Sequence, residues 1–112
     1  MANAFVNKKA DLTSTDATTL YTVPAQTTAV IKSILVSEDS NNADTITVTI
    51  TDTNDAVFNL FVLKAISARG TSELLSQPLV AAESEVIKVT AATANRLHVV
   101  LSALEIKPRE VT

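Results

Sequence analysis

The chain has 112 residues, a formal net charge of −3 and no cysteine, and hydrophobic residues make up 46% of it while aromatic residues make up 4%. This length suits one domain with its own core, which must be largely aliphatic. The lack of cysteine excludes disulfides, thiolate zinc sites and cysteine nucleophiles. An acidic protein does not attract nucleic-acid phosphates, and no apolar run resembles a signal peptide or a membrane span. We therefore expect a protein made in the cytoplasm that binds neither nucleic acid nor membrane.

Residues 1–18 are mostly polar and predict an N-terminal arm or a loosely attached first strand. Residues 19–106 predict the folded domain, and residues 107–112 a charged tail. Strands are predicted at 20–23, 29–38, 44–52, 56–63, 85–91 and 96–106, with short pieces in the less regular segment 64–77 around Gly70. Pro24 and Pro108 stop the strands that precede them.

The clearest strand signal lies in residues 44–52, where Ile46, Val48 and Ile50 alternate with threonines at 45, 47, 49 and 51. A period of two is that of a β-strand with one face in a core. The segment 52–55 then predicts a hairpin turn into the next strand. About seven or eight such strands without a helix predict an all-β fold, an antiparallel β-sandwich of jelly-roll or Ig-like type.

The chain contains a single glycine, Gly70, although hairpin turns usually recruit several. Asparagines and the aspartates near them are expected to take the left-handed or tight backbone positions instead. The asparagines concerned are Asn41, Asn42, Asn54 and Asn95.

Three strands carry apolar residues on both faces. The opposed sets are Val30, Ile34 and Val36 against Ile31 and Leu35; Phe58, Leu60 and Val62 against Val57, Phe61 and Leu63; and Leu97, Val99 and Leu101 against Val100, Leu104 and Ile106. A two-layer monomer leaves one of each pair of faces in water, so we expect another subunit to cover the second face. The candidate interface residues are Phe5, Val6, Lys8, Lys9, Ile31, Leu35, Phe58, Phe61, Val100 and Leu104.

No set of residues predicts a catalytic centre or a cofactor site. The only histidine, His98, has no partner for general-base or zinc chemistry in the sequence pattern and is interpreted as a rim or interface residue. No serine lies in a Gly-x-Ser-x-Gly turn. The acidic loops 39–44 and 52–55 could supply calcium ligands, but aspartates and asparagines at turns already have a structural role. The threonines of 44–52 lack the neighbouring ladders of an ice-binding face.

Several segments resemble small virion structural proteins of tailed bacteriophages: residues 18–25 (Thr-Thr-Leu-Tyr-Thr-Val-Pro-Ala), 75–80, 85–89 and 98–106. The resemblance covers most of the chain, from Thr18 to Ile106. It departs at Gln26 and at Glu83-Ser84-Glu85, where such proteins usually carry glycine. The resemblance therefore does not predict the geometry of these two turns, although it does predict the strand order.

The resemblance implies a non-enzymatic β-sandwich without cofactor that assembles on a virion, often as a homotrimer. The role we expect is that of a capsid decoration (cement) protein, whose partners are further copies of itself and the major capsid protein or another virion protein. The alternative within the virion is a component of the neck, tail or fibre base. A carbohydrate-binding accessory module is the alternative of another class, but it normally displays Trp or Tyr platforms, and this chain has no Trp and a single Tyr, Tyr21.

Overall fold

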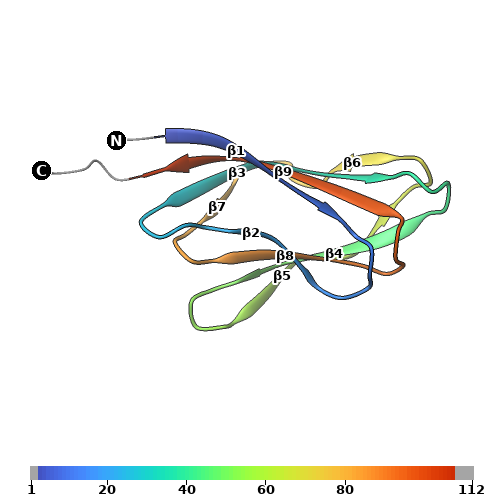
Figure 1. The fold of residues 1–112 in the computed structure, drawn as a ribbon, viewed down its shortest axis with the longest axis horizontal. Coiled ribbons are helices and arrows are strands. Elements are labelled where there is room, and N and C mark those ends of the chain that lie inside the picture. Colours follow the sequence, from blue (N-terminus) through green and yellow to red (C-terminus); the bar gives the residue numbers. More distant parts are fainter. Residues whose placement is uncertain (1–2, 108–112) are drawn as a thin grey trace, which may run out of the picture.

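The computed structural model describes residues 3–107, which form nine β-strands and no helix (Figure 1). The strands are β1 (Asn3–Asp11), β2 (Thr18–Thr22), β3 (Thr28–Glu38), β4 (Asp44–Thr51), β5 (Val57–Ile66), β6 (Thr71–Glu73), β7 (Leu79–Ala81), β8 (Val86–Ala91) and β9 (Leu97–Ile106). The described residues contain no helix that is long and apolar enough to cross a membrane.

The strands pair as one long antiparallel ribbon that is rolled onto itself. β1 pairs with β9, β2 with β8, β3 with β6 and β7, and β4 with β5. Pairing of β9 with β3 and of β8 with β4 then closes the ribbon into two sheets. The first sheet has the order β1-β9-β3-β6, with β7 beside β3, and the second has the order β2-β8-β4-β5. These nested pairs give a jelly roll, so the predicted antiparallel sandwich is confirmed and the jelly-roll alternative is the one adopted.

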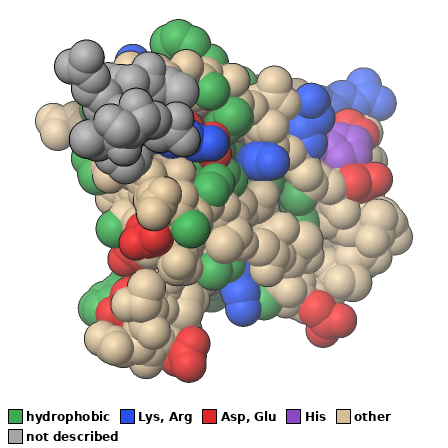
Figure 2. Space-filling model, turned by 60° about the vertical axis from the view of Figure 1, so that its left-hand side comes forward, with side chains coloured by type: hydrophobic (Ala, Val, Ile, Leu, Met, Phe, Trp, Pro, Cys, Tyr) green, Lys and Arg blue, Asp and Glu red, His purple; other side chains and the backbone are tan. Residues whose placement is uncertain are grey.

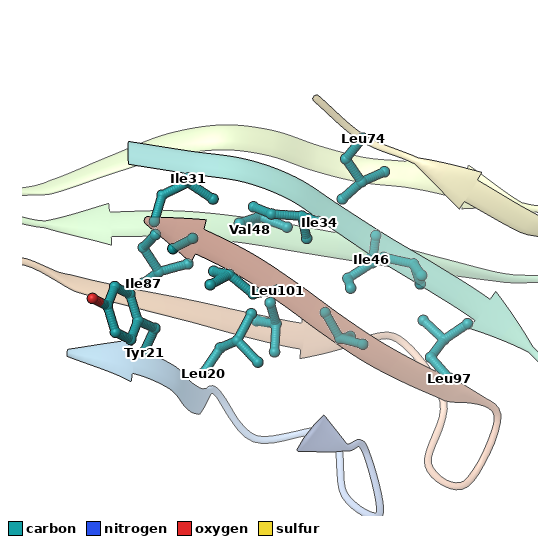
Figure 3. Close-up of a cluster of buried hydrophobic side chains, with 14 of the residues drawn as sticks. Leu20, Tyr21, Ile31, Ile34, Ile46, Val48, Leu74, Ile87, Leu97 and Leu101 are labelled. Carbon is teal, nitrogen blue, oxygen red and sulfur yellow. The ribbon is translucent and has the colours of Figure 1, made fainter. Parts of the chain in front are cut away.

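The core lies between the two sheets and is aliphatic, as the composition requires. Figure 3 shows Leu20 and Tyr21 from β2 facing Ile31 from β3 and Leu101 from β9, all of them buried. The Tyr21 hydroxyl donates a hydrogen bond of 2.6 Å to Glu105 Oε2 and so ties the second sheet to the first. Burial, together with the neighbouring Glu105 carboxylate, raises the pKa of Tyr21 well above its ordinary value, so this hydroxyl keeps its proton.

Of residues 1–18, predicted as an arm or a loosely attached first strand, residues 3–11 form strand β1. β1 pairs with β9 over its whole length, from Asn3 opposite Ile106 to Asp11 opposite His98. The side chains of Val6 and Ala10 pack against the core from this edge. Of the tail predicted at 107–112, all but Lys107 lies outside the described residues.

The alternation of residues 44–52 is confirmed, because Ile46 and Val48 are fully buried and the four threonines between and beside them lie half-buried on the other face. The hairpin after it is also confirmed, since β4 and β5 pair across the turn at residues 52–56. In the segment that gave the weakest signal, β5 continues to Ile66, Gly70 lies in the next turn, and β6 follows. The sequence did not predict β7.

The faces predicted for residues 29–38 are wrong, because β3 contains a β-bulge. The register against β9 shifts between Ile31 and Ser33, where β3 has one residue more than its partner. The extra residue reverses the alternation beyond it. Ile31, Ile34 and Val36 consequently share the inner face and are fully buried, and Ile31 cannot be the interface residue that the sequence suggested.

The tight turns use left-handed backbone at residues other than glycine. Asn41, Asp55 and Asn95 have positive φ as expected of asparagines and their neighbouring aspartates, whereas Asn42 and Asn54 do not. Gln26 and Ser84 have φ of 57° and 67°. At both turns the left-handed backbone is therefore adopted without glycine, the residue that best tolerates it.

Replacement of Gln26 or Ser84 by glycine should therefore stabilise the protein. We expect Gln26→Gly and Ser84→Gly each to raise the free energy of unfolding by about 0.5–1 kcal/mol, because glycine relieves the left-handed strain at some cost in chain entropy. Urea unfolding followed by circular dichroism measures the change. Thr53→Gly, at an exposed turn residue without positive φ, is the control and should bring no gain; equal gains for all three variants would contradict the explanation.

Candidate functional site

One continuous row of apolar side chains crosses the outer face of the first sheet. Strand register places Phe5 of β1 beside Leu104 of β9, Leu104 beside Val30 of β3, and Val30 beside Val80 of β7. Phe5 is 79% exposed and Val80 62% exposed, while the two central side chains are half-buried. We call these four residues the outer apolar row. A contiguous row of apolar side chains with exposed ends is a candidate interaction surface.

A second row on the same face has an apolar centre and charged ends. It runs from Lys9 through Val100 and Leu35 to Glu73. Leu35 is exposed, and Glu73 is held by the Ser33 hydroxyl and by the backbone N–H of Ile34 and Leu75, which lower its pKa against the opposing effect of burial. An apolar centre within a charged rim is the usual anatomy of a protein interface.

The outer face of the second sheet is polar by comparison. The corresponding row across its four strands is Asn59 of β5, Thr49 of β4, Lys88 of β8 and Thr19 of β2. Such side chains are well solvated and require no partner. Across these rows the outer face of the first sheet is apolar and that of the second is polar, and the exposed apolar side chains of the second sheet lie on its edge strand β5.

The edge strand β5 forms a separate apolar surface. Its register against β4 shifts twice, and each time β5 has the additional residue. These bulges leave Leu60 and Phe61 packed against the core and turn Val62 and Leu63 outward, where they are 62% and 64% exposed. Leu63 has a φ of 50°, and its N–H donates to the Thr47 hydroxyl at 3.1 Å.

A hollow of about 290 Å³ lies beside these residues, between β5 and the segment that joins β6 to β7. Its apolar lining consists of Leu60, Phe61, Leu74, Leu75, Pro78 and Leu79, and its polar lining of Ser76 and Gln77. Before and after Leu60 and Phe61 in the sequence, β5 carries four exposed apolar side chains, those of Val57, Phe58, Val62 and Leu63. We refer to the hollow and these four side chains together as the β5 surface.

The predicted interface residues divide between these surfaces and the core. Phe5, Leu35, Val100 and Leu104 lie on the outer face of the first sheet, and Phe58 and Phe61 belong to the β5 surface. Lys8 and Lys9 are exposed on β1. Val6 is half-buried and packs against the core, and Ile31 is fully buried within it. The alternation predicted for 56–63 is wrong, because the bulges place Leu60 and Phe61 together on the inside and Val62 and Leu63 together on the outside.

The lone histidine stands at the polar end of the first sheet's outer face. His98 Nε2 lies 3.2 Å from Asp11 Oδ1, and His98 Nδ1 lies 3.3 Å from Asp39 Oδ2. Figure 2 shows the histidine in purple next to acidic side chains, with hydrophobic side chains elsewhere over the same view. Both ring nitrogens can donate to these carboxylates only when the imidazole is protonated. His98 thus lies between the end of β1 and the loop after β3. This is a rim position, one of the two interpretations drawn from the sequence.

The acidic loops are held by their own hydrogen bonds. Asp52 Oδ1 accepts from the N–H of Asn54 and of Ala56 at 2.9 and 3.0 Å, and Asp44 Oδ2 accepts from the N–H of Thr93 at 3.1 Å. Residues 3–107 contain no group of three or more His, Asp or Glu side chains arranged to hold a metal ion. Asp44 and Asp52 thus hold backbone N–H groups of loops and turns, the structural role predicted for such residues as the alternative to calcium binding.

Glu38, which the sequence gave no reason to single out, organises the turns at one end of the sandwich. Its buried carboxylate accepts hydrogen bonds from the N–H of Ser40, Asn42 and Arg69 and from the Ser40 hydroxyl. Burial raises the pKa of Glu38, but these donors outweigh that effect and lower it to about 2. One side chain thereby fixes both the loop after β3 and the turn before β6.

Val80 and Leu63, two residues of these apolar surfaces, carried little signal in the sequence. Val80 lies on the short strand β7, which was not predicted, and the exposure of Leu63 depends on the bulge. A run of seven apolar or uncharged residues at 57–63 was the only hint, because it contains more apolar side chains than one face of a strand can bury.

No protein-family model matches the chain, and no curated protein matches it.

The Glu38 carboxylate should make stability depend on acid pH. Because its pKa is about 2 in the folded protein against an ordinary value of 4.5, its stabilising contribution is complete above pH 4.5 and disappears as the pH falls toward 2. We expect Glu38→Gln to lower the urea midpoint at pH 6 and to make the decline between pH 4.5 and 2 shallower than in the wild type.

Parallel urea titrations at several pH values between 2 and 6 provide the measurement. Asp16→Asn is the control, since the exposed Asp16 side chain makes no hydrogen bond within the described part of the chain. If stability falls between pH 4.5 and 2 in the same way in the wild type and in Glu38→Gln, Glu38 does not cause the loss of stability in acid.

Proposed function

We propose that this chain is a non-enzymatic structural protein of a tailed-bacteriophage virion, and that it decorates the capsid as an oligomer. The observation that carries the proposal is the outer apolar row from Phe5 through Leu104 and Val30 to Val80. It gives the sandwich one outer face suited to docking on another protein, while the polar face of the second sheet remains in water. The resemblance of residues 18–106 to small virion proteins supports the same role.

The ionisable side chains support a structural role as well. Glu38 and Glu73 hold backbone N–H groups in place, and the Glu105 carboxylate accepts the Tyr21 hydroxyl in the core. The carboxylates with lowered pKa are thus engaged in maintaining turns and strands, where a catalytic acid or base would need to face a substrate.

A jelly roll is compatible with several functions, among them capsid and lectin domains. The carbohydrate-binding alternative is less favoured because Tyr21, the only tyrosine, is buried on the inner face of β2 and offers no platform to a sugar. A neck, tail or fibre-base protein would use the same fold and the same apolar face. It differs from a decoration protein in the number of copies on the particle.

Copy number per virion therefore tests the proposal. Quantitative mass spectrometry of purified virions should give on the order of hundreds of copies, because a symmetric shell repeats each docking position many times. A handful of copies would assign the chain to the neck or tail, and its absence from purified virions would overturn the proposal altogether.

The outer apolar row should be needed for attachment to the shell. We expect Phe5→Asp to reduce the affinity for particles that lack the protein by about tenfold or more, because a charge replaces an exposed aromatic anchor. Co-sedimentation with such particles measures the binding. Thr19→Asp, on the polar face of the second sheet, is the control and should bind like the wild type. Equal binding by both variants would show that this face does not meet the shell.

A further inference from the structure

We infer that His98 is a proton-dependent clamp, which holds the end of the edge strand β1 more firmly in acid than in alkali. The clamp lies at the polar end of the first sheet, outside the outer apolar row, and does not depend on the proposed role in a virion.

The two ring nitrogens of His98 face carboxylates on two different elements. Nε2 lies 3.2 Å from Oδ1 of Asp11, the last residue of β1, and Nδ1 lies 3.3 Å from Oδ2 of Asp39, in the loop after β3. Strand register places Asp11 directly opposite His98. Because β9 lies between β1 and β3 in the first sheet, the imidazole bridges the end of the edge strand to the loop on the other side.

The protonation state of the ring decides how many of these contacts are hydrogen bonds. An imidazolium donates from both nitrogens, whereas a neutral imidazole has one N–H and presents a lone pair at the other nitrogen. An ionised carboxylate accepts and cannot donate. A neutral ring therefore satisfies one of the two carboxylates at a time and repels the other, so loss of the proton weakens the bridge.

The other side chains on this part of the outer face do not take the place of the imidazole. Lys9 shares the outer face of β1 with Asp11, but its Nζ donates to Asn7 Oδ1 at 2.8 Å. The residues that follow in the same row on β3 and β6 are Ser37 and Thr71, which carry no charge.

The nearest cation along the chain is also engaged elsewhere. Arg96, immediately before β9, donates from Nη1 to the Ala43 carbonyl oxygen at 3.0 Å. Within residues 3–107, neither Asp11 nor Asp39 forms a salt bridge with a lysine or an arginine. In this part of the chain the imidazole is therefore the group that balances the two carboxylates.

The end of β1 depends on the bridge more than the loop after β3 does. The Glu38 carboxylate holds that loop through the N–H groups of Ser40 and Asn42, and the Asp39 N–H donates to the Arg96 carbonyl oxygen at 3.2 Å. β1, in contrast, is an edge strand that pairs with β9 alone. Weakening of the bridge should therefore loosen the end of β1 and leave the loop in place.

The Leu12 N–H, which donates to the Leu97 carbonyl oxygen at 3.1 Å, reports on the end of β1. We compare about pH 5.5 with about pH 8, on either side of the range in which a histidine ordinarily titrates. Protection of this N–H from hydrogen exchange, corrected for the intrinsic rate at each pH, should be about two- to fivefold greater in acid, the effect of an exposed ion pair. The Val23 N–H, which donates to Glu85 at the other end of β8, is the internal control and should be protected equally at both.

His98→Gln separates the proton from the hydrogen bond. Glutamine donates through its amide and does not titrate, so the variant should show equal Leu12 protection at both pH values. Asp16→Asn, at an exposed aspartate in the loop after β1, is the control and should keep the wild-type difference. His98 is the only histidine, so no other imidazole produces the change. Wild-type protection that does not vary with pH, or a variation that persists in His98→Gln, would overturn the inference.

Discussion

A β-strand places successive side chains on opposite faces, and one inserted residue reverses that assignment for every residue beyond it. In β3 the insertion brings Ile31 onto the same inner face as Ile34 and Val36. In β5 the insertions bring Phe61 inward and turn Val62 and Leu63 outward. The core and the exposed apolar surfaces of this protein both depend on these bulges.

Because of the bulge in β3, apolar side chains from both halves of the strand point into the same core. Without the shift, either Ile31 or the pair Ile34 and Val36 would face solvent, and the first sheet would lose buried aliphatic area at its centre. The hydrogen bond from Tyr21 to Glu105 then links the second sheet to the first. The Glu38 carboxylate holds the loop after β3 and the turn before β6.

The sequence predicted the fold class because alternation is a local property that needs no knowledge of the partner strand. Residues 44–51 and 97–106 alternate without interruption, and both strands were predicted with their correct faces. Bulges are different, because the extra residue is defined only by the register against a neighbour. That is why Ile31 was assigned to the wrong face and the exposure of Leu63 was not foreseen. The pairing of β7 is likewise a tertiary effect, since three residues carry too little pattern of their own.

In the proposed role, the outer apolar row lies toward the shell of the virion. A cryo-EM map of the virion that carries this chain is the most direct measurement of that arrangement. We expect jelly-roll density on the capsid as oligomers, with Phe5 and Val80 against the shell. Density as isolated single copies, or only at the neck or tail, would contradict it.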